Sequence, residues 1–310
     1  MNSWQPVLDC LQAGDFAQAI ELLDTALSSE PLDVDGRVLR AVAHAASGST
    51  KLATHELWKA LAIAPRSEGT RRALTDMFVS GEEPPPIYRD FSLASGERQT
   101  ASDVAAIRED HRSRYEFAAN WIRRHIGSAH TTTGVDLFCG NGYGSRIVSE
   151  TAGCRMIGID GSSDAVMLAE QSYGGARTVY RQAYFPFDLV PNTADFAICF
   201  ESIEHVQDYE KFIRSIDQMT AGPLLLSFPI ERNLNFDLNK DLFKYHYRHF
   251  NIEDIESLLN PLDRRIVVTK GQAVYTMENG RLSGLLPERA MALTALRDDS
   301  QFAVIVATKG

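Results

Sequence analysis

Two acidic residues and a histidine follow a short apolar segment near the middle of the chain. Glu201, Glu204 and His205 come directly after residues 195–200, which are apolar enough for a buried strand. If Glu201 begins a helical turn, the three side chains lie at i, i+3 and i+4 and share one face. Two carboxylates and an imidazole could then bind a divalent cation. Alternatively, His205 alone could remove a proton at neutral pH, or Glu204 could cap a helix while His205 lines a pocket.

Two further histidines lie in an aromatic segment, residues 245–250, between two predicted strands. His246 and His249 could face an acceptor or supply a further metal ligand, or they could fill an aromatic cluster. The residues expected to carry a reaction are Glu204, His205, His246 and His249. The expected metal ligands are Glu201, Glu204, His205 and His249.

A glycine-rich stretch, residues 135–144, predicts the strand edge that would position these groups. An apolar strand ends in a small-residue loop and passes into helix-like sequence at 145–150. Glycine permits φ > 0 and lets a ligand approach the backbone amides. Asp160 ends the next predicted strand, 20 residues after Gly140, where a carboxylate can accept both ribose hydroxyls. Because position 145 is serine rather than glycine, the spacing differs from a dinucleotide fingerprint.

This loop resembles motif I of the class I S-adenosylmethionine (SAM)-dependent methyltransferases, with Asp136 four positions before the first glycine. The resemblance implies SAM as cofactor. It also implies an α/β fold with a Rossmann-like seven-stranded sheet, whose last two strands, 266–268 and 302–306, form an antiparallel pair. Gln182 stands near the position where the family usually has an Asp for the adenine amino group. The cofactor contacts expected on this basis are Asp136, Cys139, Gly140, Asn141, Gly142, Asp160, Gly161, Gln182 and Glu201.

Three later segments, 201–206, 224–229 and 245–250, resemble the subgroup with ubiquinone-biosynthesis O-methyltransferases and many glycan or antibiotic O-methyltransferases. The resemblance covers about residues 111–310 and favours a small-molecule or glycan hydroxyl as acceptor. The Glu-x-x-Glu-His spacing is also similar to that of the small-RNA 2′-O-methyltransferases, which use a metal to hold ribose hydroxyls. The alternatives are a protein or RNA methyltransferase that recruits its acceptor, and a non-catalytic scaffold.

The first 66 residues repeat at a period of 34, which resembles tetratricopeptide helix pairs. Residues 67–79 could add a capping helix. Two repeats are short for an independent fold, so we expect them to dock on the catalytic domain or on a second copy of the chain, although a groove for a protein partner is the alternative. The expected parts are a helical repeat domain, 1–80, a proline-rich linker, 81–102, and a methyltransferase domain, 103–310.

Two segments flank the expected catalytic core. Residues 103–126 have a helical pattern, and the segment 111–115 could reach the SAM carboxylate or belong to a solvated basic face. The arginines expected to lie largely off the apolar face are Arg112, Arg114, Arg123 and Arg124. Residues 271–300 are expected to be an insertion near the mouth of the active site.

The overall composition is that of a globular protein, with 310 residues and a net charge of −10. The acidic balance makes nucleic acid an unlikely main partner, because phosphate backbones require clustered Lys and Arg. The four cysteines have no CxxC spacing and predict a reducing compartment. No apolar run has the length of a membrane span. We therefore expect a cytoplasmic protein.

Overall fold

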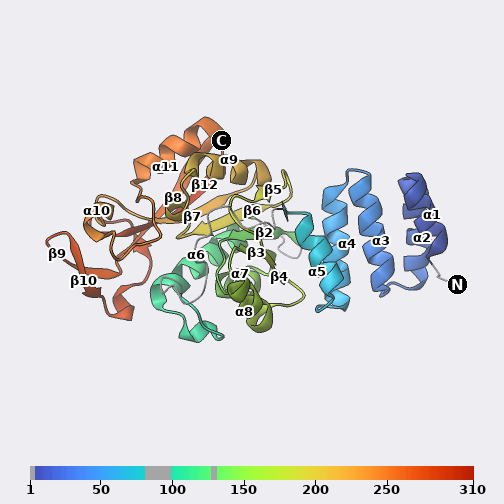
Figure 1. Cartoon of the computed structure of the whole chain (residues 1–310), viewed down its shortest axis with the longest axis horizontal. Helices are drawn as coiled ribbons and strands as arrows, with labels where there is room; N and C mark the ends of the chain where they lie inside the picture. Colours follow the sequence, from blue (N-terminus) through green and yellow to red (C-terminus); the bar gives the residue numbers. More distant parts are fainter. Residues whose placement is uncertain (1–3, 81–98, 127–130) are drawn as a thin grey trace.

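A mixed sheet lies at the centre of the larger, C-terminal part of the molecule (Figure 1). The computed structural model describes residues 4–80, 99–126 and 131–310, and within these ranges eight strands form the sheet. Five strands are parallel, and β12 is antiparallel to both of its neighbours. The expected seven-stranded Rossmann-like sheet is present, with the two-residue β11 added at one edge. The spatial order is β11 (Thr294–Ala295), β8 (Arg264–Gln272), β12 (Phe302–Lys309), β7 (Leu224–Pro229), β6 (Phe196–Phe200), β2 (Thr133–Leu137), β3 (Arg155–Asp160) and β4 (Thr178–Gln182).

Helices cover both faces of this sheet, because successive side chains of each strand point to opposite faces. Val135 and Leu137 of β2 share a core with Phe212 of α9. Met156 of β3 belongs to the opposite core, with Val148 of α7. Figure 1 shows the two helical layers on either side of the strands. One layer contains α9 (Tyr209–Met219) and α11 (Ile252–Leu259), and the other contains α6 (Glu109–His125), α7 (Tyr143–Ala152) and α8 (Ser163–Tyr173).

The helix expected over residues 103–126 is shorter than predicted. It begins at Glu109, because Val104–Ala106 forms a separate 3₁₀ turn that the Asp103 side chain caps by accepting from the Ala105 amide at 2.9 Å. Arg114, expected on the solvated face, is only 2% exposed. Its guanidinium finds polar partners inside the protein, which is what allows an arginine to be buried.

Five helices precede the sheet and extend to one side of it (Figure 1). Gly14 and Gly48 adopt left-handed φ values of 78° and 80° at the turns that follow α1 and α3. Ala19 and Ala53, which recur at the same spacing, are both buried. The fifth helix corresponds to the expected capping helix. The five are α1 (Gln5–Ala13), α2 (Phe16–Ser29), α3 (Val34–Ala46), α4 (Thr50–Ile63) and α5 (Glu68–Asp76).

The last of these helices joins the N-terminal helices to the part of the chain that contains the sheet through charged side chains. Arg71 of α5 forms an ion pair with Glu170 of α8 and donates to the carbonyl oxygen of Thr178 at 3.0 Å. Asp76 accepts from Arg181 of β4 at 2.9 Å. The N-terminal helices thus contact α8 and β4 directly within this chain.

Apolar side chains complete the same junction. Leu74 and Phe78 are fully buried in the cluster that also contains Ile157 of the central sheet. Immediately after, β1 (Val79–Ser80) pairs antiparallel with β5 (Asp188–Leu189). The repeats and the sheet therefore share one core. Residues 81–98 of the expected linker lie outside the described residues.

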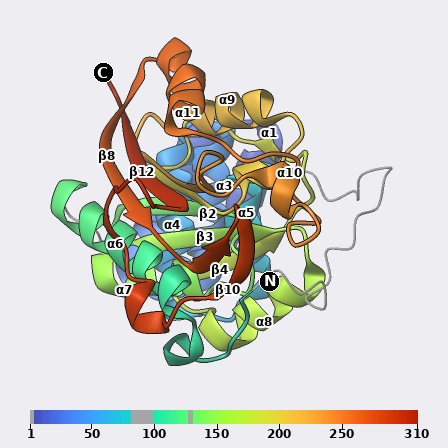
Figure 2. The ribbon, with the colours of Figure 1, turned by 90° about the vertical axis from the view of Figure 1, so that its left-hand side faces the viewer.

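The expected insertion at residues 271–300 forms a cap at the end of the molecule opposite the repeats, and this end faces the viewer in Figure 2. It contains the hairpin of β9 (Tyr275–Glu278) and β10 (Arg281–Leu285), beside α10 (Phe236–Asn239). Its small core includes Leu234, Phe243, Val274, Met291 and Phe302. None of the described helices combines the length and the apolar composition needed to cross a bilayer.

Candidate active site

The carboxyl ends of the parallel strands bring the predicted site residues to one edge of the sheet. Gly140 follows β2, Asp160 and Gln182 end β3 and β4, and Glu201 follows β6 directly. Asp160 and Gln182 are partners in the β3–β4 register. In open α/β sheets, ligands bind outside this edge.

The glycines of the loop after β2 serve two different purposes. Gly140 has φ 56°, and a Cβ built on it would meet nothing within 4 Å, so its outer side is open to a ligand. A Cβ on Gly142 would lie 2.5 Å from the ring of Tyr180 and 2.8 Å from Ala169. The space beside Gly140 leaves room for a ligand near the backbone, whereas glycine at position 142 is required by close packing within the protein.

Asp160 ties the loop to the tip of β3. Its Oδ2 accepts from the amide of Gly140 at 2.9 Å, and its Oδ1 accepts from the amide of Ser162 at 2.8 Å. A carboxylate oxygen can accept more than one hydrogen bond, so ribose hydroxyls can share this group. Beside it, Gln182 donates from Nε2 to the Gly161 carbonyl at 3.3 Å and to the Tyr184 hydroxyl at 2.8 Å.

Asp136 is fully buried beneath the loop. It accepts from the Ser145 hydroxyl at 2.8 Å and from the Tyr115 hydroxyl at 3.2 Å. Burial raises the pKa of this carboxyl to about 7, although both hydrogen bonds act in the opposite direction. Asp136 therefore holds α6 and α7 together, and any effect it has on a cofactor passes through these two helices.

The side chains of Cys139 and Asn141 are also buried. Asn141 donates from Nδ2 to the Ala101 carbonyl at 2.6 Å, and its Oδ1 has no hydrogen-bond partner among the described residues. A buried acceptor without a partner favours a ligand that brings a donor. The open side of Gly140, the carboxylate of Asp160 and this amide oxygen together fit SAM, which carries ribose hydroxyls and an ammonium group.

Glu201 has a different environment from the one its spacing predicts. With φ 49° it lies outside the 3₁₀ turn Ile203–His205, so the expected shared face of Glu201, Glu204 and His205 does not form. Its Oε1 lies 3.0 Å from Nη1 of Arg114 and accepts from the Ser227 hydroxyl at 2.7 Å. Burial raises the pKa of Glu201, and the Arg114 guanidinium opposes this.

The role of Arg114 was missed by sequence reasoning. It also donates from Nε to Oε1 of Gln272 at 2.7 Å, and its guanidinium lies 4.7 Å from the centre of the Phe302 ring. The available signal was its position on the helix, directly before the buried Tyr115 and four residues before the buried Ala118.

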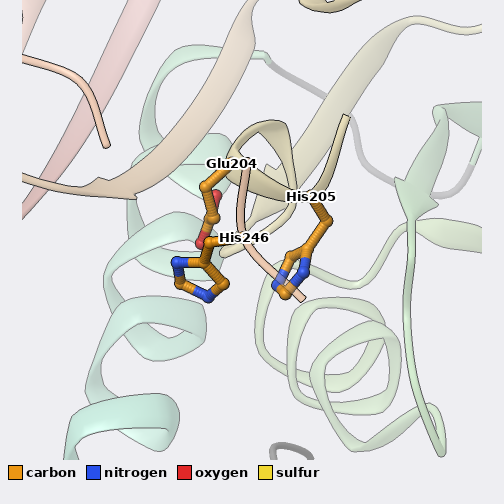
Figure 3. Close-up of side chains that lie close together, drawn as sticks. All are labelled: Glu204, His205 and His246. Carbon is orange, nitrogen blue, oxygen red and sulfur yellow. The ribbon is translucent and has the colours of Figure 1, made fainter. Parts of the chain in front are cut away.

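Three side chains, Glu204, His205 and His246, form a compact group beyond the end of β6, called the group after β6 (Figure 3). One ligand atom each from Glu204, His205 and His246 lies within 4.8 Å of the others. Glu204 is 0% exposed, and neither carboxylate oxygen has a hydrogen-bond partner among the described residues. Burial, and then the nearby Glu201, raise the pKa of Glu204 well above its ordinary value. The alternative that Glu204 caps a helix does not hold, because Asp208 caps the following helix.

His249 lies behind this group rather than in it. Its Nδ1 donates to the Leu234 carbonyl at 2.6 Å, and its Nε2 lies 2.9 Å from Nδ1 of His246. Burial lowers the pKa of His249 to about 4 and lowers that of His246 further. The expected metal set of Glu201, Glu204, His205 and His249 is therefore replaced in the structure by Glu204, His205 and His246.

Two surface hollows lie away from all of these groups. They have volumes of about 490 and 470 Å³ and share Pro191 and Asn192 in their walls. In the first, Asp217 is already paired with Arg264 at 2.5 Å. We therefore locate the candidate site by its buried polar groups rather than by these hollows.

Comparisons with known proteins identify relatives of this chain. Two Mycobacterium tuberculosis proteins, named as probable S-adenosylmethionine-dependent methyltransferases, are 28% identical over 149 residues, or 45% of this chain and 53% of each relative. The chain thus spans about half the length of these curated relatives. A magnesium protoporphyrin IX methyltransferase from Synechocystis, solved with SAH, is 18% identical, with a TM-score of 0.48 over 69% of this chain and 90% of its own.

A SAM-dependent methyltransferase from Clostridium acetobutylicum is 12% identical, with a TM-score of 0.46 over 64% of this chain and 92% of its own. A family model described as a methyltransferase domain matches residues 105–265, which is more than half of the chain and includes the glycine loop, Asp160 and the group after β6. The chain therefore belongs to the methyltransferase domain family.

Proposed function

We propose that this protein transfers the methyl group of SAM to a hydroxyl oxygen of a small-molecule or sugar-containing acceptor. The observation that carries the proposal is the position of buried acceptor groups and an imidazole at the same edge of the sheet. Asp160 accepts a hydrogen bond from the amide of Gly140 at 2.9 Å. His205 comes shortly after β6, the strand beside β2 in the sheet.

The cofactor end of the site is built from the loop and the strand tips. The open side of Gly140 accommodates the methionine part, Asp160 accepts from the ribose, and Gln182 is the nearest amide to the adenine. Asn141 offers its buried Oδ1 to the ammonium group. When bound, SAM supplies an electrophilic methyl group on a sulfonium.

At the methyl-acceptor end of the site, the hydroxyl must be aligned with the methyl group of SAM, and a base must take its proton. His205 donates from Nδ1 to the Tyr245 carbonyl, 3.2 Å away. A carbonyl can only accept, so Nε2 of the neutral ring carries the lone pair that takes the proton of the hydroxyl. Such a base contributes about 10²–10⁴-fold, and alignment of the reacting atoms contributes the larger share. The aromatic surface beside it, where Phe243 stacks on His246 at 4.8 Å, suits an acceptor with a ring or an apolar part.

For the N-terminal helices we propose two tetratricopeptide-like repeats and a capping helix over residues 1–80, followed by a linker, 81–102, and the catalytic domain, 103–310. The left-handed turn glycines 34 positions apart support the repeats. Their role is a packing arm that can also meet a second copy of the chain. A role in recruiting a protein acceptor is the alternative, and the net charge of −10 argues against RNA. The cytoplasmic location stays a prediction.

The test is methyl transfer from labelled SAM to a cell extract divided into small-molecule, protein and RNA fractions. We expect label in the small-molecule fraction, in a base-stable ether, and no label with the Asp160→Ala variant. Label confined to protein or RNA would overturn the choice of acceptor.

A second experiment separates a packing arm from a recruiting arm without removing the shared core. Leu32 and Val42 are 72% and 47% exposed on the repeats. Their replacement by Ser leaves turnover of a small acceptor unchanged, whereas a recruited macromolecular acceptor would lose activity. Deleting residues 1–80 would remove Leu74 and Phe78 from the core that they share with Ile157, so the surface variants are the cleaner comparison.

A further inference from the structure

A buried carboxylate without a hydrogen bond is the feature of this chain that most requires a ligand. Glu204 is fully buried, and both of its oxygens lack a partner among the described residues. The nearest cationic candidate is already engaged, since Arg114 is paired with Glu201 at 3.0 Å. Buried polar groups in native proteins are satisfied by protein, water or an ion, and a bound cation would remove the cost of ionising Glu204 in this place.

Main-chain carbonyls fix the tautomers of the two imidazoles beside Glu204, which belong to His246 and His205. For His246, the carbonyl acts through His249. His249 must donate from Nδ1 to the Leu234 carbonyl at 2.6 Å, so the Nε2 of its neutral ring accepts. His246 therefore donates from Nδ1 to that Nε2 at 2.9 Å, which leaves its own Nε2 with the lone pair.

The same argument applied to His205 gives the same result. Its Nδ1 donates to the Tyr245 carbonyl at 3.2 Å, so Nε2 is the nitrogen with the lone pair. Two neutral imidazoles thus each carry a lone pair on Nε2 beside an unpartnered carboxylate. A hydrogen bond on the other ring nitrogen is what orients metal-binding histidines in proteins.

We propose that Glu204, His205 and His246 bind one divalent transition-metal ion, with His249 and the Leu234 carbonyl holding His246 in place. Two imidazoles and one carboxylate suit Zn²⁺, Co²⁺, Mn²⁺, Fe²⁺ or Ni²⁺ better than Mg²⁺ or Ca²⁺, which prefer oxygen ligands alone. Three protein ligands leave further positions for solvent or an acceptor oxygen. With the ion bound, the Nε2 lone pair of His205 would serve as a ligand instead of as the base of the proposed function, and the ion would lower the pKa of the acceptor hydroxyl in its place.

The present geometry needs only a small closure around an ion. One ligand atom of each residue lies within 4.8 Å of the others. Bonds of about 2.1 Å to a shared ion bring such atoms to about 3–3.5 Å from one another. Figure 3 shows the carboxylate of Glu204 directed toward the His246 ring.

The experiment uses the full chain, stripped with a chelator and titrated with Co²⁺ or Zn²⁺ alone, followed by visible absorption, calorimetry and elemental analysis. We expect one ion per chain. We expect His246→Ala and Glu204→Gln to weaken binding more than 100-fold, and His249→Ala to weaken it about 10- to 100-fold. His125→Ala is the matched control, because that ring stacks on Trp121 at 4.4 Å, away from the group, and its loss should change nothing.

Each outcome decides the proposal. Absence of a bound ion, or binding that Glu204→Gln and His246→Ala leave unchanged, overturns it. If either variant fails to fold, His205→Ala provides the third ligand deletion, with the circular dichroism spectrum as the check on folding. A parallel titration with SAH separates this inference from the proposed function. SAH bound without metal refutes the metal site alone, whereas metal bound without SAH refutes the proposed cofactor.

Discussion

His246 and His249 are joined by a hydrogen bond of 2.9 Å between Nδ1 of the first and Nε2 of the second. His249 is in turn anchored to the Leu234 carbonyl at 2.6 Å. His249, which does not belong to the group of Glu204, His205 and His246, therefore sets the orientation of the His246 ring. His249 is for this reason a positioning residue rather than a catalytic one.

Replacing His249 by Ala should lower kcat by roughly 10-fold or more, with a smaller change in the KM of the acceptor, because the ring of His246 loses its orientation. His249→Gln should restore part of kcat. Its side-chain oxygen can accept from His246, and its amide can donate to Leu234. Steady-state kinetics of both variants provide the check, and a glutamine variant no better than the alanine variant would contradict the positioning role.

Removing the carboxylate of Asp160 should abolish tight binding of the cofactor. The Asp160→Ala variant leaves the amides of Gly140 and Ser162 without their acceptors and removes the partner of the ribose. We expect the Kd for SAH to rise at least about 30-fold, which corresponds to about 2 kcal/mol. Calorimetry measures this directly. Asp160→Asn retains one acceptor oxygen, so we expect its Kd to lie between those of the wild type and the alanine variant. An unchanged Kd in both variants would rule out a role of Asp160 in cofactor binding.

The two loop glycines should respond differently to a methyl group. Gly142→Ala places Cβ 2.5 Å from the Tyr180 ring at φ 84°, so we expect a loss of stability of about 2–4 kcal/mol. Gly140→Ala meets no atom within 4 Å, and its φ of 56° costs about 1 kcal/mol. We expect Gly140→Ala to weaken SAH binding instead. Chemical denaturation and calorimetry of both variants test the contrast, and equal destabilisation with equal affinities would contradict it.

Asp136 should make the free energy of unfolding depend on pH in an unusual direction. Its folded pKa of about 7 lies above the ordinary value of 3.8, so the folded chain holds the proton more tightly than the unfolded chain. The stabilisation is complete below about pH 4 and is lost as the pH rises to 7, on the order of 4 kcal/mol in all.

Asp136→Asn removes this titration. The difference in unfolding free energy between the wild type and the variant should therefore decrease as the pH rises from 4 to 7. Urea denaturation across that range provides the measurement, and using the difference cancels the contributions of all other groups. A difference that grows with pH would show that Asp136 is charged in the folded chain.

The contact between the repeats and the sheet should contribute measurably to stability. Arg71→Ala removes the ion pair to Glu170 and the hydrogen bond to the Thr178 carbonyl, so we expect a loss of about 1–3 kcal/mol. Arg72→Ala is the matched control one position away, because that side chain is 53% exposed and should contribute less than 1 kcal/mol. Thermal unfolding of the two variants compares them. Equal effects would show that the Arg71 contacts add nothing.

Local patterns were sufficient to predict the strands and the position of the cofactor loop. Short apolar runs placed β2, β3 and β6 to within a few residues. The 20-residue spacing placed Asp160 beside Gly140, where its carboxylate accepts a hydrogen bond from the Gly140 amide. Such features depend on residues close in sequence and on the parallel order of neighbouring strands.

The misplaced residues depend on contacts between distant segments. Glu201 was expected to begin a helical turn, but its partner Arg114 lies 87 positions earlier and holds it away from Glu204. His246 replaces His249 in the group because the carbonyl of Leu234, on a separate loop, captures His249. The close packing of Gly142 against the Tyr180 ring of β4 was not foreseen either. Spacing along the chain does not report these tertiary contacts.

The most direct test of SAM binding at the sheet edge is a crystal structure of the full chain with bound SAH. We expect the ribose hydroxyls within hydrogen-bond distance of the Asp160 carboxylate, the methionine part against the open side of Gly140, and the sulfur directed toward the group after β6. Density for SAH at any other place on the molecule, or an SAH whose ribose does not contact Asp160, would contradict the proposed site.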